Sequence, residues 1–141
     1  MTNNILTKYG FDKAGAIFAS AFTSTDYTLT NYKYIDFIVA SGEGEQASIT
    51  AQIYGKSTKD DIGQALPFRV IGNNGMPEEY IEAEGVGLNI GGNGSMAVYR
   101  ITADDLSKGG FDRVALKLTA ATESTVIGSV TTVRYEPRYT E

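Results

Sequence analysis

The clearest pattern in the sequence is an alternation of apolar and polar residues with a period of two. Within residues 112–119, Val114, Leu116 and Leu118 fall on one side of an extended chain, and mostly polar residues fall on the other. Residues 34–40 alternate in the same way. Successive side chains of a β-strand point to opposite faces of a sheet. These segments are therefore predicted to be strands with one buried face and one face in water.

Short segments of this kind recur about every ten residues between turns rich in glycine and asparagine. One stretch differs. Thr102 is a good helix N-cap, Asp104 and Asp105 suit a first turn, and Gly109 suits a helix end, so we expect one short helical turn there. The sequence predicts an all-β fold, an antiparallel β-sandwich or jelly-roll-like barrel of about eight to ten short strands.

Two pairs of segments are predicted to form hairpins, because a short turn joins each pair. Residues 47–54 are expected to pair back on residues 34–40, and residues 112–135 are expected to form one long hairpin. The alternation breaks late in the second hairpin, which indicates a bulge near Thr131 or Thr132.

The length of 141 residues predicts a single domain, residues 1–141. Residues 1–13 have few apolar anchors and are expected to be an N-terminal arm. Residues 136–141 are expected to be a short tail, because Pro137 has no amide hydrogen with which to continue a strand.

Composition excludes several kinds of function. The chain has no cysteine and no histidine, so thiolate metal sites and Ser-His or Cys-His catalysis are excluded. A net charge of −5 without a basic cluster argues against nucleic-acid binding. No apolar run approaches the ~20 residues of a membrane span, and the first residues do not resemble a secretion signal.

Two glycine-rich motifs suggest a nucleotide site, but neither has the residues that such a site requires. The glycine-rich residues 85–94 lack the glycine spacing of a dinucleotide site, and Gly55-Lys56-Ser57 lacks the first glycine of a phosphate loop. The paired acidic residues lie in predicted turns, where solvated carboxylates are ordinary. We therefore expect no enzyme, no catalytic residue, no cofactor and no metal.

Nine tyrosines allow two interpretations. They could form a platform on which sugar rings stack, or they could lie at protein interfaces, where tyrosine is enriched. The interface is favoured, because the chain has no tryptophan. Asp36 interrupts an apolar strand and is expected on the wet face or at a subunit contact.

An acidic all-β chain without cysteine or histidine, with a polar start and an end at residues 134–141 that mixes tyrosines and charges, resembles the capsid decoration (cement) proteins of tailed bacteriophages. The resemblance is one of overall character along the whole chain. It implies a non-enzymatic virion structural protein that binds the outer surface of an assembled capsid and stabilises it. The implied partners are the major capsid protein and copies of the chain itself, which in this family often form trimers. The implied location is the capsid exterior, after assembly in the host cytoplasm.

Two alternatives stay open: a carbohydrate- or receptor-binding module of a viral appendage, and a head-tail connector or tail structural protein. For the decoration role, the chain ends are expected to supply the protein contacts, because they combine apolar and aromatic anchors with charge. The candidates are Ile5, Leu6, Tyr9, Phe11, Tyr135, Arg138 and Tyr139.

Overall fold

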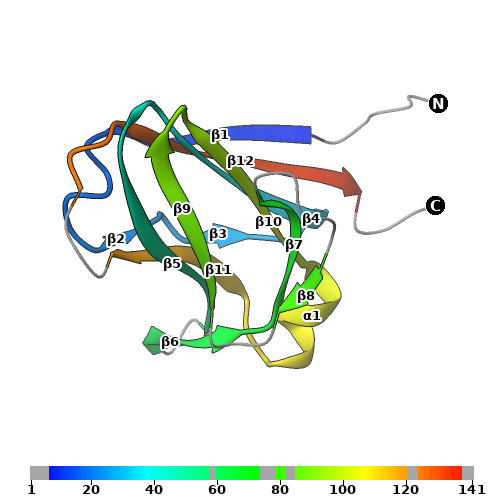
Figure 1. Cartoon of the computed structure of the whole chain (residues 1–141). Coiled ribbons are helices and arrows are strands. Elements are labelled where there is room, and N and C mark those ends of the chain that lie inside the picture. Colours follow the sequence, from blue (N-terminus) through cyan, green and yellow to red (C-terminus); the bar gives the residue numbers. More distant parts are fainter. Residues whose placement is uncertain (1–6, 58–59, 74–78, 82–84, 121–123, 138–141) are drawn as a thin grey trace.

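The computed structural model describes residues 7–57, 60–73, 79–81, 85–120 and 124–137. In these residues the chain forms two antiparallel six-stranded sheets packed face to face (Figure 1). Sheet A has the order β1 (Thr7–Gly15), β12 (Gly128–Pro137), β4 (Tyr32–Ser41), β10 (Ser95–Thr102), β7 (Phe68–Asn73) and β8 (Glu79–Ile81).

Sheet B is built around two of its strands. It has the order β2 (Phe22–Thr23), β11 (Arg113–Ala120), β5 (Gly44–Ser57) and β6 (Asp60–Leu66). In addition, β3 (Tyr27–Thr28) pairs with β11, and β9 (Val86–Gly92) pairs with β5. The predicted all-β sandwich is confirmed. The described strands do not close into a barrel, so the sandwich is the form adopted.

The core lies between the two sheets, where the predicted inward faces meet. Ile35, Phe37 and Val39 of β4 are fully buried, and so are Val114 and Leu116 of β11. Each large aliphatic or aromatic side chain buried in this way contributes roughly 1.5–3 kcal/mol. The period-two pattern therefore identified the buried face of these strands correctly.

Both predicted hairpins are wrong. β4 belongs to sheet A and pairs with β10 and β12, whereas β5 belongs to sheet B and pairs with β11, β6 and β9. In the same way, β11 lies in sheet B and β12 in sheet A. These connections are arches that carry the chain from one sheet to the other. An arch and a hairpin both place the apolar faces in one core, so the alternation cannot tell them apart.

The irregularity predicted near Thr131 occurs in the pairing of β1 with β12, but the extra residue lies in β1 and not in β12. β12 pairs with β4 without interruption from Gly128 to Tyr135, and the register shift lies in β1, between Phe11 and Lys13. The apolar alternation breaks because Thr132 occupies an inward position, where it is 1% exposed. A polar residue stands where the pattern calls for an apolar one, and the strand remains regular.

The short helix forms as the sequence predicts. α1 (Ala103–Lys108) begins after Thr102, whose hydroxyl oxygen accepts a hydrogen bond of 3.1 Å from the backbone N–H of Asp105. Ala103 and Leu106 are buried. The helix therefore covers one end of the core and follows directly on β10 (Figure 1).

The expected arm and tail need correction. Residues 7–13 belong to β1, the edge strand of sheet A, with Thr7 opposite Tyr135. Strand β12 extends to Pro137, which lies opposite Tyr32. Most of the expected arm and the first two residues of the expected tail are thus part of the sandwich. Residues 1–6 and 138–141 lie outside the described residues.

Candidate functional site

The outward side of sheet A is the most distinctive surface of the molecule. Residues directly opposite on neighbouring strands point to the same side of a sheet. The register pairs Arg100 with Asp36, which in turn lies opposite Val133. The outer face of sheet A is defined by the outward residues of its three central strands: Tyr34, Asp36, Ile38, Ala40, Met96, Val98, Arg100, Ser129, Thr131, Val133 and Tyr135.

One half of this face is apolar on β4 and β10, and Ser129 and Thr131 of β12 border it; it is called the apolar half below. Val98 lies opposite Ile38, and Met96 lies opposite Ala40. Met96 is 56% exposed, while Ile38 and Val98 are partly exposed. The core lies on the opposite side of sheet A, so this half faces away from sheet B. A sheet with one solvated face ordinarily carries polar residues there, so this half has the composition of a covered face.

The other half contains an ion pair at its centre. The guanidinium of Arg100 donates two hydrogen bonds to the carboxylate of Asp36, of 2.8 and 3.1 Å. The Asp36 side chain is only 13% exposed and that of Arg100 is 25% exposed. A two-point pair of this kind fixes both side chains. Asp36 lies on the outer face, as its position in the strand predicts.

Two tyrosines complete this half. The rings of Tyr34 and Tyr135 lie 5.2 Å apart, and the Arg100 guanidinium lies 5.3 and 5.5 Å from their centres. The Tyr135 hydroxyl donates a hydrogen bond of 3.2 Å to Asp36. Burial raises the pKa of Tyr135, and the adjacent Asp36 carboxylate raises it further. The four side chains form one preordered group of aromatic rings and charges.

Cations also lie against the other partly buried tyrosine rings. Arg134 lies 5.4 Å from the ring centre of Tyr27 and 5.0 Å from that of Tyr32. Lys117 lies 5.4 Å from the ring centre of Tyr54 on sheet B. Of the tyrosines whose side chains the structure describes, the remaining one is buried in the core. The described tyrosine rings outside the core are thus partly buried and engaged in cation–π contacts, and they do not form an open row for sugar stacking.

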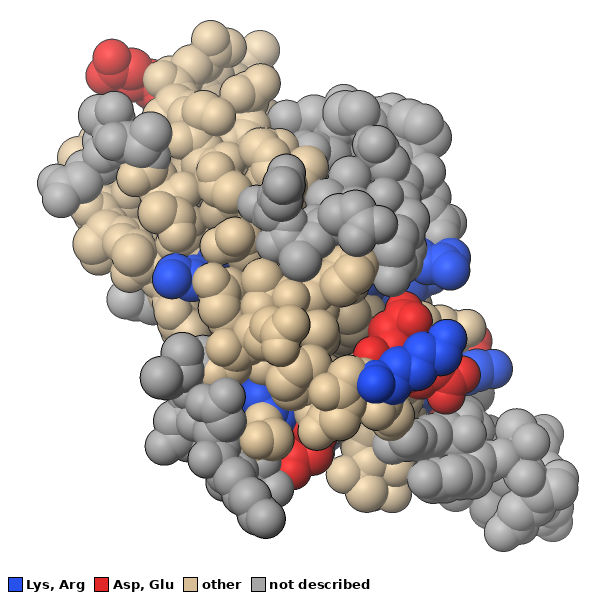
Figure 2. Space-filling view, turned by 90° about the horizontal axis from the view of Figure 1, so that it is seen from below, with Lys and Arg blue, Asp and Glu red and all other residues tan. Residues whose placement is uncertain are grey.

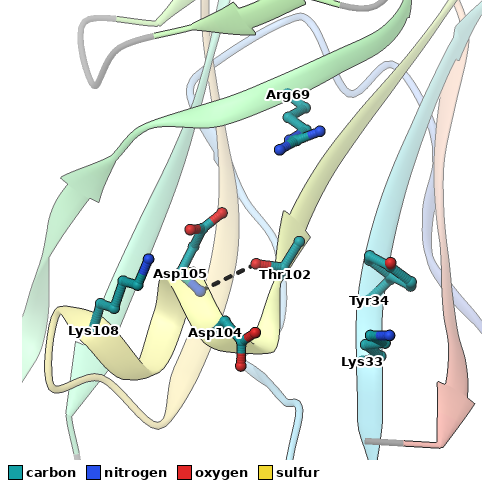
Figure 3. A pocket seen from close by; sticks show the side chains of 7 residues that line it. All are labelled: Lys33, Tyr34, Arg69, Thr102, Asp104, Asp105 and Lys108. Carbon is teal, nitrogen blue, oxygen red and sulfur yellow. Dashed lines mark hydrogen bonds between the residues drawn. The ribbon is translucent and has the colours of Figure 1, made fainter.

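A charged pocket adjoins the aromatic group at the α1 end of the face. It has a volume of about 250 Å³ and is lined by Lys33, Tyr34, Arg69, Thr102, Asp104, Asp105 and Lys108. Figure 3 shows that Arg69 projects from β7 towards the side of α1 from which Asp105 projects, with Lys33 on β4, which lies on the other side of β10. Acidic and basic side chains lie intermixed in one cluster in the view from below (Figure 2). The pocket can hold a charged group through ion pairs.

A second cavity lies on sheet B. Its volume is about 350 Å³, and its lining of Gln46, Ala47, Ser48 and Asn89 carries no charge. No group of three or more acidic residues placed to hold a metal ion occurs among the described residues. The described part of the chain also contains no helix that is long and apolar enough to span a membrane.

The structure places only some of the predicted contact residues. Tyr135 is a member of the aromatic group. Tyr9 and Phe11 lie in β1 opposite Val133 and Thr131, although their side chains lie outside the described residues. Four further candidates also lie outside the described residues: Ile5, Leu6, Arg138 and Tyr139.

Sequence reasoning missed Arg100 and the apolar half of the outer face. A signal for Arg100 was present, because a carboxylate such as Asp36 within an apolar strand requires a charged or hydrogen-bonding partner. The apolar half could have been noticed from Ile38 and Val98, which make their strands apolar on both sides.

No known family model matches the chain, and none of the curated proteins matches it in sequence. Among solved structures, the SPBc2 prophage-derived protein YomS is similar, with a TM-score of 0.55 over 96% of this chain and 98% of that one, at 9% identity. A Bacillus endospore appendage protein described as forming disulfide-linked pili has a TM-score of 0.41, 13% identity and coverage of 96% and 90%. The CBM36-1 domain of a multidomain xylanase from the hindgut metagenome of Trinervitermes trinervoides has a TM-score of 0.33, 9% identity and coverage of 96% and 100%. At these TM-scores the last two likenesses do not establish a shared fold. The chain therefore shares the fold of a prophage-derived protein along nearly its whole length.

Proposed function

We propose that the protein is a non-enzymatic structural component of a phage virion, which binds the outer surface of the assembled capsid and stabilises it. The observation that carries this proposal is the outer face of sheet A. Its apolar half and its group of tyrosine, arginine and aspartate side chains have the composition of a protein contact surface. The fold shared with a prophage-derived protein is consistent with a phage origin.

The order of the aromatic group favours a protein partner. Arg100 is held by Asp36 and lies against Tyr34 and Tyr135 before any partner arrives. Binding then costs little further side-chain entropy. A sugar would need ring surface that the Arg100 guanidinium already contacts, so the carbohydrate-binding alternative is less favoured.

Capsid decoration requires no chemistry beyond binding. A protein that binds only the assembled shell stabilises that shell by mass action, and many copies add their contributions. The charged pocket combines lysine, arginine and aspartate side chains, which suit ion pairing with a partner. The role proposed for this chain is therefore purely one of contact, with the major capsid protein as its partner.

Purified particles of the virus or prophage that encodes the chain provide the test. The chain should be present at a copy number comparable to that of the major capsid protein and should lie on the shell exterior by cryo-electron microscopy. Particles assembled without the chain should release DNA at a lower temperature. Absence from purified particles would overturn the proposal, and a few copies confined to one vertex or the tail would indicate a connector or tail role.

The arm suggested by the sequence does not supply a clean test. Deletion of residues 1–13 would remove most of β1 and expose the edge of β12. Loss of particle binding would then reflect damage to sheet A. Substitutions on the outer face itself are the sharper variants.

A further inference from the structure

Two charged features lie at opposite ends of the outer face of sheet A. The pocket lies beside Tyr34, at the start of β4. The arch that follows β4 lies after Ser41 and leads into sheet B. Seven residues separate Tyr34 from Ser41, which places the two features about 23 Å apart at ~3.3 Å per strand residue. Each copy of the protein thus carries the pocket at one end of this face and the arch at the other end.

The pocket is lined by more basic than acidic side chains, although the chain as a whole is acidic. Lys33, Arg69 and Lys108 come from β4, β7 and α1, and the fold brings all three residues to the lining of one cavity. Asp104 and Asp105 share the cavity, so three cations and two carboxylates leave a formal charge of +1. That charge suits a single incoming carboxylate and does not suit a polyanion such as nucleic acid.

The arch is narrow, acidic and held in place. Glu43 stands between Gly42 and Gly44, and all three residues are exposed. The N–H of Gly42 donates a hydrogen bond of 2.7 Å to the carbonyl of Ile127. Gly44 has a φ of 153°, in the region that favours glycine. Glu43 is thus an exposed carboxylate flanked by two residues without side chains, which leaves it accessible to a partner.

A second hydrogen-bonded contact anchors the base of the arch. The Ser41 hydroxyl lies 2.7 Å from the Ser95 hydroxyl and accepts a hydrogen bond of 3.2 Å from the N–H of Gly91. Glu45, two residues beyond Glu43, is also exposed. The arch and the start of β5 therefore present two carboxylates, Glu43 and Glu45, next to an anchored backbone.

We propose that the arch of one copy inserts Glu43 into the charged pocket of a second copy, forming a head-to-tail contact. Charge complementarity identifies the occupant, because an exposed acidic turn meets a cavity of about 250 Å³ with a positive formal charge. A contact between two different surfaces of one chain closes into a ring or continues as an open row. The outer face between the two contacts stays available to another partner.

Charge reversal tests this contact with the purified full chain. The arch variant combines Glu43→Lys with Glu45→Lys, and the pocket variant combines Lys33→Glu with Lys108→Glu. Sedimentation velocity over a concentration series at low salt should show that the unaltered chain self-associates. Each variant alone should self-associate with an affinity reduced about tenfold or more, because like charges then meet at the contact. An equimolar mixture of the two variants should regain the association of the unaltered chain, because opposite charges meet again at every contact.

Lys117→Glu on the outward side of sheet B is the control for a change in net charge, and it should associate like the unaltered chain. Circular dichroism should confirm that every variant is folded. An unaltered chain that stays monomeric, variants that associate normally, or a mixture of folded variants that fails to recover would each overturn the inference. The inference extends the proposed function without depending on it. If the arch variant binds particles normally but no longer self-associates, the decoration role remains intact. If the unaltered chain self-associates but is absent from particles, only the decoration role is refuted.

Discussion

The outer faces of the two sheets differ sharply although their inner faces are alike. The outward residues of sheet B on β5 and β11 include Ser48, Thr50, Gln52, Lys117 and Thr119. This is the polar surface expected where a sheet meets water. Sheet A instead carries aliphatic residues and an ordered aromatic group on its outer face. Both sheets bury a full inner face, so folding does not require the apolar residues outside, and the proposed binding role would account for them.

The largest expected effect separates the two outer faces directly. Val98→Asp places a carboxylate in the apolar half of sheet A, and Thr50→Asp places one on sheet B. Burial of an unpaired charge in the contact should weaken particle binding by Val98→Asp about 100-fold or more. Binding by Thr50→Asp should be unchanged. Titration of particles with labelled protein measures both. Equal losses for the two variants would remove the distinction between the faces.

A smaller effect concerns the aromatic group. Arg100→Ala removes the partner of a carboxylate that is 13% exposed, so it should lower the free energy of unfolding by about 2 kcal/mol. Lys117→Ala on sheet B loses only a cation–π contact and should cost about 0.5–1 kcal/mol. Urea denaturation at neutral pH measures both values. If Arg100→Ala costs no more than Lys117→Ala, the group is not the ordered unit described above.

Alkaline pH should act on both faces of sheet A. Burial raises the pKa of the inward Tyr99, and burial together with Asp36 raises the pKa of Tyr135 on the outer face. A raised pKa stabilises the folded state below the unfolded value of about 10, and this stabilisation is lost as pH rises above that value. Tyr99 alone should reduce stability by about 1.4 kcal/mol per pH unit there.

Thermal unfolding between pH 9 and pH 11.5 distinguishes the two tyrosines. Tyr99→Phe should flatten the decline more than Tyr135→Phe, because Tyr135 remains in contact with solvent. A decline that neither substitution changes would show that other groups cause the alkaline loss.

The smallest effect contrasts neighbours on opposite faces of β12. The Thr132 hydroxyl is buried without a hydrogen-bond partner among the described residues, so Thr132→Val should raise the free energy of unfolding by about 1 kcal/mol. Thr131→Val on the outer face should change it by less than about 0.5 kcal/mol. Urea denaturation of both variants checks the assignment of the faces, and the reverse ranking would contradict it.

The sequence was sufficient for the burial pattern of single strands and for the helix start at Thr102, because both depend on residues close together in the chain. It was insufficient for strand pairing. The arch at Gly42 and Gly44 has the length and composition of a hairpin turn, and only the packing of distant strands decides between the two. The same limit applies to the candidate site. Tyr135 could be chosen from its position, but its partners Asp36 and Arg100 are 99 and 35 positions away, and the fold alone brings them together.

The pairing of β1 with β12 sets how the protein responds to mechanical force. β1 begins at Thr7 opposite Tyr135, so the described chain enters and leaves sheet A at one corner. Antiparallel hydrogen bonds lie perpendicular to their strands. Tension applied through the two ends therefore breaks the bonds of this pair one after another, like a zipper, and at low force. In the proposed decoration role, load would instead reach the protein through its faces, where many contacts resist together.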